Sequence, residues 1–412
     1  MKFFFPDSQD QVNPHFEMIA EEHAVHRIRQ RDDRYAHEVL RARPFDGLLV
    51  AKPIVDGRGG GAGAHYNQAA RQRLYRLGVR DFFRLHGAHA DVITMGDCGA
   101  FTYAKEDEPP YRIDEVIDFY DTCGFDRGVA PDHIIFGFEK PGKPVSPDLK
   151  NEFIRRSNIT LRNADEFLQC HSDRNCKFEP MAAAHGWSPE SYTESVLALM
   201  DLGYRRIAMG GMVPLRTPDI ISTLKMVRGV IRDGVELHLL GVTRVNDMPL
   251  FMSYGVTTFD STSPFFQAFK DSTDNYYSGN STYVAIRIPQ VDGNATLKKL
   301  IISGRIDQSE AIKRERHALN AVRNYAERKC TVEDAVSAVM DYESLVMVRT
   351  DRSEQYRRTL SARPWENCTC GICDQVGVEV IIFRGSERNK RRGFHNLAVF
   401  RDRIDHLEMN KQ

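Results

Sequence analysis

The feature that most constrains this sequence is a regular alternation of apolar and helical segments between residues 46 and 264. Seven short apolar segments occur in this range, and a helical pattern separates each from the next. Strands that are apolar on both faces and alternate with helices indicate a parallel sheet. Near-eightfold repetition over about 250 residues favours a closed (β/α)₈, TIM-like barrel over an open sheet.

The expected elements follow from the same pattern. We expect seven strands in the order 46–55, 91–101, 133–139, 178–186, 205–211, 236–242 and 256–259, with an eighth at 283–289. The helices between them are expected at 66–85, 113–123, 147–170, 189–202, 218–232 and 246–254.

The chain is expected to have four parts. An N-terminal segment (1–45) precedes the barrel (46–300), and a helical insertion (301–360) and a zinc-binding subdomain with a final helix (361–412) follow it. The charged insertion is helical up to about residue 348 and is broken at 329–331, where Thr331 can cap the next helix.

Composition excludes several classes of protein. The 412 residues are 42% hydrophobic and 27% charged, which is typical of a soluble globular protein. The net charge of −1 means that any nucleic-acid surface must be a local patch. No apolar run reaches membrane-spanning length, and the first residues lack the features of a secretion signal, so we expect a cytoplasmic protein without a membrane partner.

Two segments near the N-terminus have local patterns. Residues 27–43 contain six arginines in a mixed-charge run, which favours a solvated helix face over a helix that contacts phosphates. The glycine-rich segment 57–63 lacks the Lys-Ser/Thr pair of a nucleotide-binding loop, so a mobile loop over a site is the better interpretation.

The C-terminal cysteines predict a metal site. Cys368, Cys370 and Cys373 fall within six positions, and His395 follows 22 positions after the last of them. Three thiolates and one imidazole complete the tetrahedral coordination of Zn²⁺, which leaves no position for a substrate, so a structural role is expected. The alternatives are three reduced cysteines in a turn, or His406 in place of His395.

Polar or glycine residues end five of the expected strands. They are Asp97, Glu139, His185, the pair Gly210–Gly211, and Asp260. The carboxyl ends of parallel strands meet at one face of a barrel, so these residues become neighbours there. Two carboxylates in different environments can divide the roles of nucleophile and acid/base. The structural alternatives are that His185 is a satisfied polar residue and that Glu139 pairs with a neighbouring lysine.

These motifs together resemble the queuine/archaeosine tRNA-guanine transglycosylase superfamily. The segments 96–101 (GDCGAF), 208–215 (AMGGMVPL) and 239–264, with the CxCxxC…H pattern, carry the resemblance. The segments 3–12 and 29–39 look like the DpdA-type branch, which is associated with placing 7-deazaguanines in DNA.

The sequence also departs from the family pattern. Ala100 and Thr102 stand where the family has Gly and Gln, and His185–Gly186 stands where it has a base-reading Gln-Gly. Glu139 is the expected counterpart of its base-reading Asp. The helical insertion has no counterpart that we recognise in the tRNA enzymes.

The resemblance implies a base-exchange transglycosylase that replaces guanine in DNA with a 7-deazaguanine such as 7-cyano-7-deazaguanine (preQ0). Asp260 would be the nucleophile that forms a covalent bond to the sugar, and Asp97 the general acid and base. The base would be held by Glu139, His185, Gly186, Gly210, Gly211 and Met212. The basic run Arg384, Arg388, Lys390, Arg391 and Arg392 would hold phosphates, or it is a solvated surface strip.

Two alternatives have different substrates or no chemistry. The first is the same reaction on tRNA, and the second is a non-catalytic, zinc-stabilised nucleic-acid-binding subunit. The resemblance implies as partners a nucleic acid, a 7-deazaguanine base and either a second copy of the chain or an accessory protein. The expected location is the cytoplasm of a bacterium or a phage-infected cell.

Overall fold

The computed structural model describes residues 1–58, 66–140, 142, 144–270, 273–345 and 350–409. Most of the glycine-rich segment 57–63 lies outside these ranges. The chain divides into two compact units. The barrel unit comprises residues 1–9, 45–262 and the C-terminal end from residue 407, and the helical unit comprises residues 10–44 and 263–406. This division differs from the expected one, because residues 1–9 join the barrel and residues 263–300 leave it.

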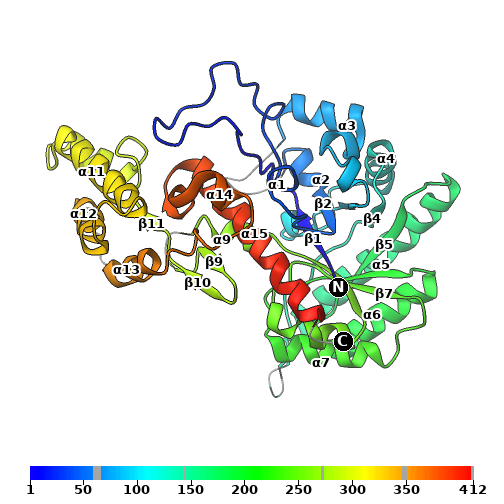
Figure 1. Ribbon diagram of the computed structural model, residues 1–412. Helices are drawn as coiled ribbons and strands as arrows, with labels where there is room; N and C mark the ends of the chain where they lie inside the picture. The colour runs from blue at the N-terminus through cyan, green and yellow to red at the C-terminus, as the bar shows by residue number, and fades with distance from the viewer. Residues whose placement is uncertain (59–65, 141, 143, 271–272, 346–349, 410–412) are drawn as a thin grey trace. The chain divides into compact units, whose positions relative to one another are not determined.

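The barrel unit is a closed barrel of eight parallel strands in sequence order (Figure 1). This confirms the predicted fold class. The strands are β1 (Lys2–Pro6), β2 (Gly47–Ala51), β3 (Ile93–Asp97), β4 (Arg127–Val129), β5 (Glu179–Ala184), β6 (Arg206–Met209), β7 (Glu236–Leu239) and β8 (Val256–Asp260). The inside of the barrel is a buried apolar cluster that includes Phe4, Met95, Val129, Met181 and Ala208.

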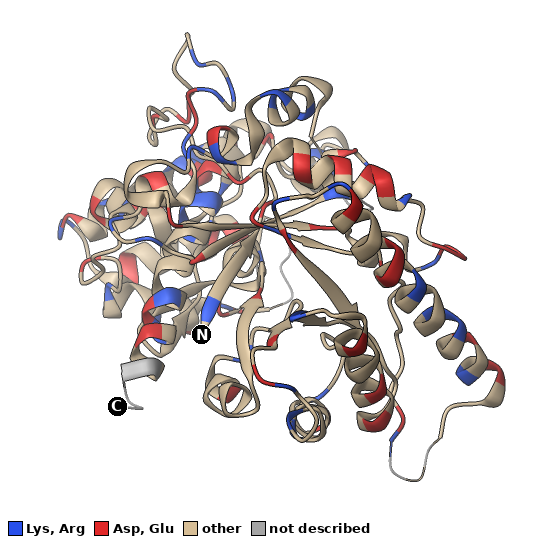
Figure 2. Cartoon of the chain, turned by 90° about the vertical axis from the view of Figure 1, so that its right-hand side faces the viewer, with Lys and Arg blue, Asp and Glu red and all other residues tan. Residues whose placement is uncertain are grey.

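Helices connect consecutive strands on the outside of the barrel, as in other barrels of this class. They are α2 (Lys52–Val55), α3 (Gln68–Phe82), α4 (Ile113–Cys123), α5 (Pro147–Asp173), α6 (Pro189–Leu202), α7 (Thr217–Arg228) and α8 (Met248–Ser253). Figure 2 shows that charged residues are spread over these helices whereas the strands carry few. Among the described helices, none combines the length and the apolar character needed to cross a membrane.

The first and last strands of the barrel differ from the expected ones. The N-terminal residues form β1, which pairs with both β2 and β8. Phe3, Phe4 and Phe5 are all buried, which is the pattern of a strand covered on both faces. The strand expected at 283–289 is therefore not the eighth strand of the barrel. Within 283–289, Tyr283 ends β10 (Ser281–Tyr283) and Ile286–Arg287 form β11, which pairs with β12 (Ile382–Phe383) in the helical unit.

The fourth strand lies six residues before the expected one. Residues 133–139 are not a strand, and β4 is the short segment Arg127–Val129. Gly128 is required in β4, since a Cβ atom there would lie 2.4 Å from the Tyr120 ring. The displacement of the strand changes which polar residue follows it at the rim of the barrel, because Asp132 and not Glu139 is the first polar residue after β4.

The helices of the barrel were easier to predict because their ends carry clear signals. The bounds of α4 and α6 agree with the expected 113–123 and 189–202. The α6 helix begins after Ser188, whose hydroxyl accepts from Ser191 N–H, and ends before Gly203 with φ of 110°. Pro189 occupies the first helical position, which suits its fixed φ and its missing N–H.

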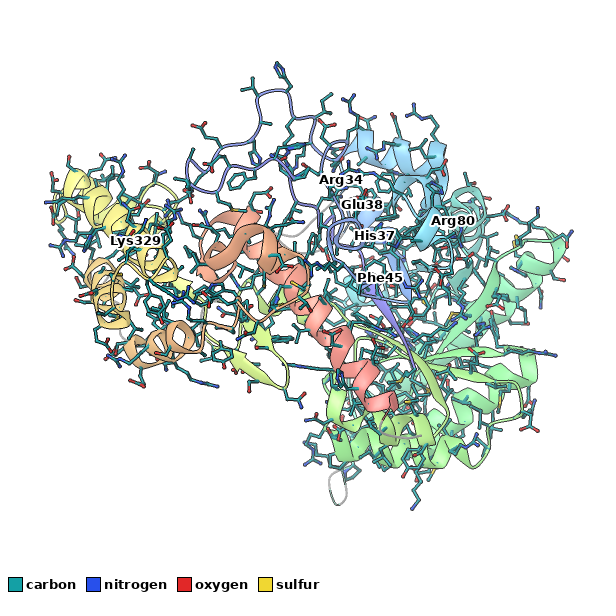
Figure 3. All side chains as sticks on the ribbon, viewed as in Figure 1. Arg34, His37, Glu38, Phe45, Arg80 and Lys329 are labelled. Atoms are coloured by element: carbon teal, nitrogen blue, oxygen red, sulfur yellow. The ribbon has the colours of Figure 1, made fainter. Side chains whose placement is uncertain are left out.

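The helical unit contains the remaining elements. They are α1 (Ala36–Val39), α9 (Ser263–Gln267), β9 (Tyr276–Ser278), β10 (Ser281–Tyr283), β11, α10 (Ala295–Ile302), α11 (Gln308–Ala326), α12 (Val332–Ser344), α13 (Ser353–Ala362), α14 (Ile372–Val376), β12 and α15 (Gly385–Met409). The predicted break between α11 and α12 is confirmed, and Thr331 caps α12 by accepting from Asp334 N–H. The expected helix over 27–43 is limited to α1, where Arg34 pairs with Glu38 at 3.0 Å (Figure 3).

Candidate active site and metal centre

Asp260 ends β8 and is held by two donors. His238 Nε2 lies 3.1 Å and the Gly241 N–H nitrogen 2.9 Å from the same oxygen, Oδ1. His238 Nδ1 lies 2.8 Å from Thr258 Oγ1, whose hydroxyl can donate to it, so that the ring proton resides on Nε2 and points at the carboxylate. Among the described residues both donors bind Oδ1, which leaves Oδ2 as the oxygen available for chemistry.

Asp97 ends β3 and carries the clearest electrostatic signal of the site. Burial raises the pKa of its carboxyl group to about 7, and the negative charges of Asp132 and Asp260 add to the shift. The Gly99 N–H, which donates to Oδ2 at 3.1 Å, opposes it. Asp97, Asp132 and Asp260 lie at or just after the carboxyl ends of β3, β4 and β8, so the three carboxylates lie at the same rim of the barrel. A carboxyl group with this pKa can donate and accept a proton near neutral pH.

Asp132 was missed in the sequence, although both of its carboxylate oxygens are hydrogen-bonded. The Cys98 thiol donates to Oδ1 at 2.7 Å and His185 Nε2 lies 2.5 Å from Oδ2. Burial raises the pKa of Cys98, which keeps its thiol protonated as a donor. Asp132 could have been predicted from its position three residues after β4, but the sequence pattern places that strand at 133–139.

The end of β6 is a close-packed turn against His185. A Cβ atom at Gly210 would lie 2.2 Å from His185 Cε1, and Gly211 has φ of 70°. Tyr192 OH donates to the Gly210 carbonyl at 2.8 Å and fixes the turn. Within the described chain, His185 Nδ1 is buried and has no hydrogen-bond partner. Gly210 is therefore required so that the imidazole can approach the backbone, whereas Gly211 is required by its positive φ and by the Ile135 carbonyl oxygen, which would lie 2.8 Å from an added Cβ atom.

The other expected base-binding residues are placed differently. Gly186 is packed against Tyr192, whose backbone nitrogen would lie 2.6 Å from an added Cβ atom. The Met212 side chain is fully buried, so only its backbone could meet a base. Glu139 is partly exposed beyond the displaced strand, and its N–H donates to the Trp187 carbonyl at 2.7 Å. The reason for expecting Glu139 at the rim, its position at a strand end, does not hold.

The predicted metal ligands come together in the helical unit. One atom from each of Cys368, Cys370, Cys373 and His395 lies within 4.8 Å of all the others. His395 Nδ1 faces the three sulfur atoms at 3.3–3.5 Å, while Nε2 donates to the Tyr277 carbonyl at 2.7 Å. A backbone carbonyl that orients the ring in this way is typical of metal-binding histidines. The set could hold a metal ion, and His406, which contacts the Asp402 carbonyl, is not part of it.

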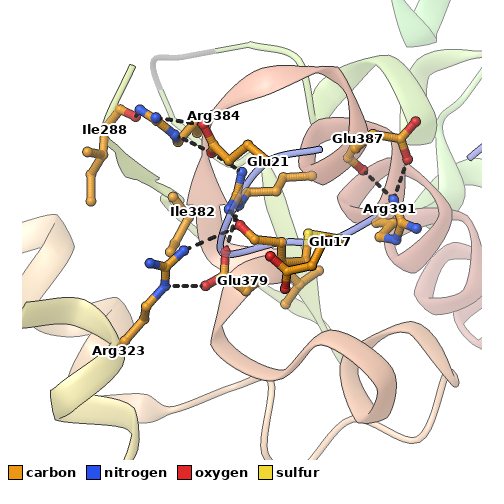
Figure 4. A network of polar contacts seen from close by, with 12 residues as sticks. Glu17, Glu21, Ile288, Arg323, Glu379, Ile382, Arg384, Glu387 and Arg391 are labelled. Atoms are coloured by element: carbon orange, nitrogen blue, oxygen red, sulfur yellow. Dashed lines mark hydrogen bonds and ion pairs between the residues drawn. The ribbon is translucent and has the colours of Figure 1, made fainter. Parts of the chain in front are cut away.

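The basic run at the start of α15 is not a surface strip. Arg384, Arg388, Arg391 and Arg392 are all buried, with at most 5% of each residue exposed. Arg384 binds Glu21 (Figure 4). Arg384 also binds Glu315, and Arg388 binds Glu21 and Glu379. These guanidinium groups are therefore committed to carboxylates of the same unit. The expectation that they hold phosphates is contradicted.

The last three cations of the run are also used internally. Arg391 pairs with Glu387 and donates to the Asn13 carbonyl at 2.6 Å. Arg392 is fully buried and donates to the carbonyls of Val380, Ile382 and Ala268. Lys390 is partly buried and donates to the Gln11 carbonyl at 3.0 Å. Buried cations need such partners because an unpaired charge is costly to remove from water.

Asp97 ends β3 and Asp260 ends β8 of one closed parallel barrel. This is the arrangement expected for the barrel-fold transglycosylases that the motifs resemble. No family model matches the chain. A curated DNA-guanine transglycosylase of Salmonella montevideo is 46% identical over 410 residues, which cover 98% of this chain and 97% of that protein. The chain therefore belongs to the DNA-guanine transglycosylase family and is an enzyme of the glycosyltransferase type. The resemblance to the DNA-modifying branch is confirmed at this level.

Proposed function

We propose that this enzyme replaces guanine in DNA with a 7-deazaguanine of the preQ0 type, through a covalent bond between Asp260 and the sugar. The observation that carries the proposal is the raised pKa of Asp97, to which the charges of both Asp132 and Asp260 contribute. A protonated carboxyl group beside an ionised one is the arrangement that glycosyl transfer through two displacements requires.

In the first displacement, Asp260 Oδ2 attacks C1′ of the target nucleotide. The C1′–N9 bond breaks, its electron pair goes to N9, and the Asp97 carboxyl group donates the proton that guanine carries away. The product is an ester between Asp260 and the sugar. The fixed position of Oδ1, bound by His238 and Gly241, holds the carboxylate in place during the attack.

In the second displacement, the incoming base restores the nucleotide. The Asp97 carboxylate accepts the N9 proton of the 7-deazaguanine, N9 attacks C1′, and the ester bond to Asp260 breaks. Both aspartates then return to their starting protonation states. Because Asp97 must act once as an acid and once as a base, a pKa near 7 suits both half-reactions.

We assign the reading of the base edge to Asp132 in place of Glu139. A carboxylate offers about four lone-pair sites, so Asp132 can accept from a guanine N1–H and N2–H while it remains bound to Cys98 and His185. Adenine lacks these two donors on that edge. The backbone of Gly210, Gly211 and Met212, together with His185, would line the rest of the base site.

We also propose that the Cys₃His cluster holds Zn²⁺ in a structural role. Three thiolates and one imidazole form a closed tetrahedral set, and the Tyr277 carbonyl fixes the imidazole that completes it. A bound ion would link the segment at 368–373 to the middle of α15.

DNA is favoured over tRNA because the Salmonella montevideo relative is named for DNA. The test is incorporation of labelled guanine and of labelled 7-cyano-7-deazaguanine into DNA and into tRNA by the purified protein. We expect incorporation into DNA. Incorporation into tRNA alone would contradict the proposal that DNA is the substrate. Exchange of guanine without use of 7-cyano-7-deazaguanine would contradict the proposed incoming base.

A further inference from the structure

Two exposed phenylalanines meet at the rim of the barrel unit, the same unit that carries the proposed active site. Phe101 lies in the short 3₁₀ helix η2 (Ala100–Tyr103), which follows Asp97 at the end of β3. Phe136 lies on the irregular segment that follows β4 and Asp132. Because β3 and β4 are neighbouring parallel strands, both segments leave the barrel at one rim. Phe101 is 70% and Phe136 46% exposed.

The rings of Phe101 and Phe136 pack against each other edge to face. Their centroids are 5.6 Å apart and their planes are inclined by 85°, which is a favourable geometry for an aromatic pair. An edge-to-face contact covers at most one face of each ring, so each ring keeps a face for another flat group. Single exposed apolar side chains are common on proteins, but two aromatic rings in contact at the rim of a candidate active site indicate a binding surface.

The two segments that carry these rings are joined by polar contacts. Arg156 of α5 donates to the Ala104 carbonyl, after η2, and to the Ile134 carbonyl, on the segment after β4, both at 2.9 Å. His133 Nε2 lies 2.9 Å from the Glu106 carbonyl oxygen and links the same two segments again. The aromatic pair is therefore held in place before a ligand arrives, which lowers the entropic cost of binding.

The segment that carries Phe136 also touches the proposed base site. The carbonyl oxygen of the preceding residue, Ile135, would lie 2.8 Å from a Cβ atom at Gly211, in the turn after β6. The Ile135 side chain is buried and anchors this part of the segment. The backbone before Phe136 thus packs against the turn that is proposed to line the base, while the Phe136 ring contacts Phe101 and stays half-exposed.

We propose that Phe136 stacks on the base that neighbours the target guanine in the DNA strand, and that Phe101 supports its ring through the edge-to-face contact. A strand that delivers its guanine to Asp260 has to cross the rim on which the pair lies. Its bases are therefore the flat apolar groups that reach the two rings. Stacking on an aromatic side chain accepts any base and would offset part of the energy needed to unstack the target. This proposal rests on the proposed function for its substrate.

Other occupants of the pair fit the site less well. A protein partner seated on it would cover the rim through which the strand reaches Asp260. The target guanine itself is proposed to lie against Asp132 and the Gly211 backbone, which are both buried, whereas Phe136 is half-exposed. A half-exposed ring suits a neighbouring base that remains outside the site.

The test measures binding of full-length protein variants to single-stranded oligonucleotides by fluorescence anisotropy. The reference strand contains one guanine, in a context that supports incorporation of labelled guanine or, if none does, within oligothymidine. Two further strands carry an abasic sugar on the 5′ or the 3′ side of this guanine. The variants are Phe136→Ala, Phe136→Tyr, which keeps the ring, and the control Met226→Ala. Met226 is 39% exposed in the last turn of α7, which leads back to the amino ends of the strands.

Phe136→Ala should weaken binding of the reference strand by roughly five- to a hundredfold, the effect of losing one stacked base, and keep the slope of log Kd against log salt. In the wild type, one of the two abasic strands should show a similar loss, and Phe136→Ala should add little to it. Phe136→Tyr and the control should bind all three strands like the wild type.

Three results would overturn the proposal. The first is an affinity of Phe136→Ala for the reference strand equal to that of the control. The second is full additivity of the Phe136→Ala change and each abasic change, because independent effects exclude a contact between the ring and a neighbouring base. The third is weaker binding of free guanine by Phe136→Ala, because the ring would then hold the target base.

Failure of this proposal can be distinguished from failure of the proposed function. If Phe136→Ala binds every strand like the wild type and the wild type incorporates labelled base into DNA, only the stacking role is overturned. If Phe136→Ala and one abasic strand show the expected non-additive loss but the wild type incorporates no base into DNA, the stacking role stands and the proposed reaction fails.

Discussion

The His238 Nε2 atom lies 3.1 Å from Asp260 Oδ1, and the two residues come from the neighbouring strands β7 and β8. Thr258 on β8 faces the other ring nitrogen at 2.8 Å. The nucleophile of the proposed reaction is therefore positioned by groups built into the barrel itself. Rigid strand ends position a reacting group more precisely than a loop does.

Replacement of Asp260 by Asn should remove the nucleophile while keeping the contact with His238. We expect incorporation of labelled guanine into DNA to fall by at least about 10³-fold, since an amide cannot form the ester. A protein–DNA adduct that survives denaturing electrophoresis should be detectable in the wild type and absent in the variant. Asp201→Asn, an exposed change on α6, is the control. Activity that persists in Asp260→Asn would contradict the assignment.

The raised pKa of Asp97 predicts a pH dependence of stability. The ordinary pKa is 3.8 and the folded value about 7, so the folded state holds this proton more tightly than the unfolded state. The stability associated with Asp97 is therefore complete below about pH 4 and is lost as the pH rises to about 7. Asn cannot ionise, so the Tm of Asp97→Asn relative to the wild type should increase between these two pH values. A constant difference in Tm would contradict the shifted pKa.

Asp132→Asn should change the pH at which the first displacement slows. The rate of adduct formation in the wild type should fall as the pH rises through about 7, because Asp97 loses the proton it must donate. Removal of the Asp132 charge lowers the pKa of Asp97, so the fall should occur at a lower pH in the variant. Single-turnover rates over a pH series provide the measurement. An unchanged midpoint, equal to that of the surface control Asp118→Asn, would show that the two carboxylates are not coupled.

If the cluster binds zinc, replacing a cysteine inside it should change zinc content and Tm, whereas replacing a cysteine elsewhere in the helical unit should change neither. Cys370→Ser should lose bound zinc and lower the Tm, because a serine hydroxyl is a poor ligand for Zn²⁺ and metal binding contributes to folding. Cys330→Ser, outside the cluster and hydrogen-bonded to the Ala321 carbonyl, should keep both. The metal content of purified protein is measured by mass spectrometry. A wild type without zinc, or full occupancy in Cys370→Ser, would exclude the proposed site.

Because the arginines of α15 are buried in ion pairs, replacing one of them should lower the stability of the protein and not simply remove a phosphate contact. Arg388→Ala leaves Glu21 and Glu379 without a shared partner, and breaking a buried ion pair costs roughly 3–5 kcal/mol. Urea unfolding should show this decrease in the free energy of unfolding, whereas Arg316→Ala on the surface of α11 should change it by less than about 0.5 kcal/mol. Equal stability in the two variants would contradict the structural role of Arg388.

The sequence predicted the barrel and several of its residues because local signals were strong. The bounds of α4 and α6 follow from their caps and apolar periodicity, and Asp97 and Asp260 end the strands that were expected to deliver them. The metal ligands were evident because their spacing in sequence is itself the signal. Each of these inferences depends on residues close together in the chain.

The predictions that were wrong concern features that depend on residues far apart in the sequence or on weak local signals. The β4 strand has only three residues, including an arginine and a glycine, so its apolar signal was weaker than that of 133–139. The burial of Arg384 and Arg388 depends on Glu21, which lies more than 360 positions away and cannot be recognised as a partner from spacing. For the same reason the sequence predicts an exposed run of cations, which either holds phosphates or is a solvated strip.

The position of β1 has a consequence for how the enzyme becomes active during synthesis. This strand leaves the ribosome first, yet its Phe4 pairs in register with Asp260 at the end of the strand made last. Pairing between such distant segments is entropically costly and tends to form late in folding. Closure of the barrel, and with it the placement of the proposed nucleophile, therefore has to wait until β8 has been synthesised.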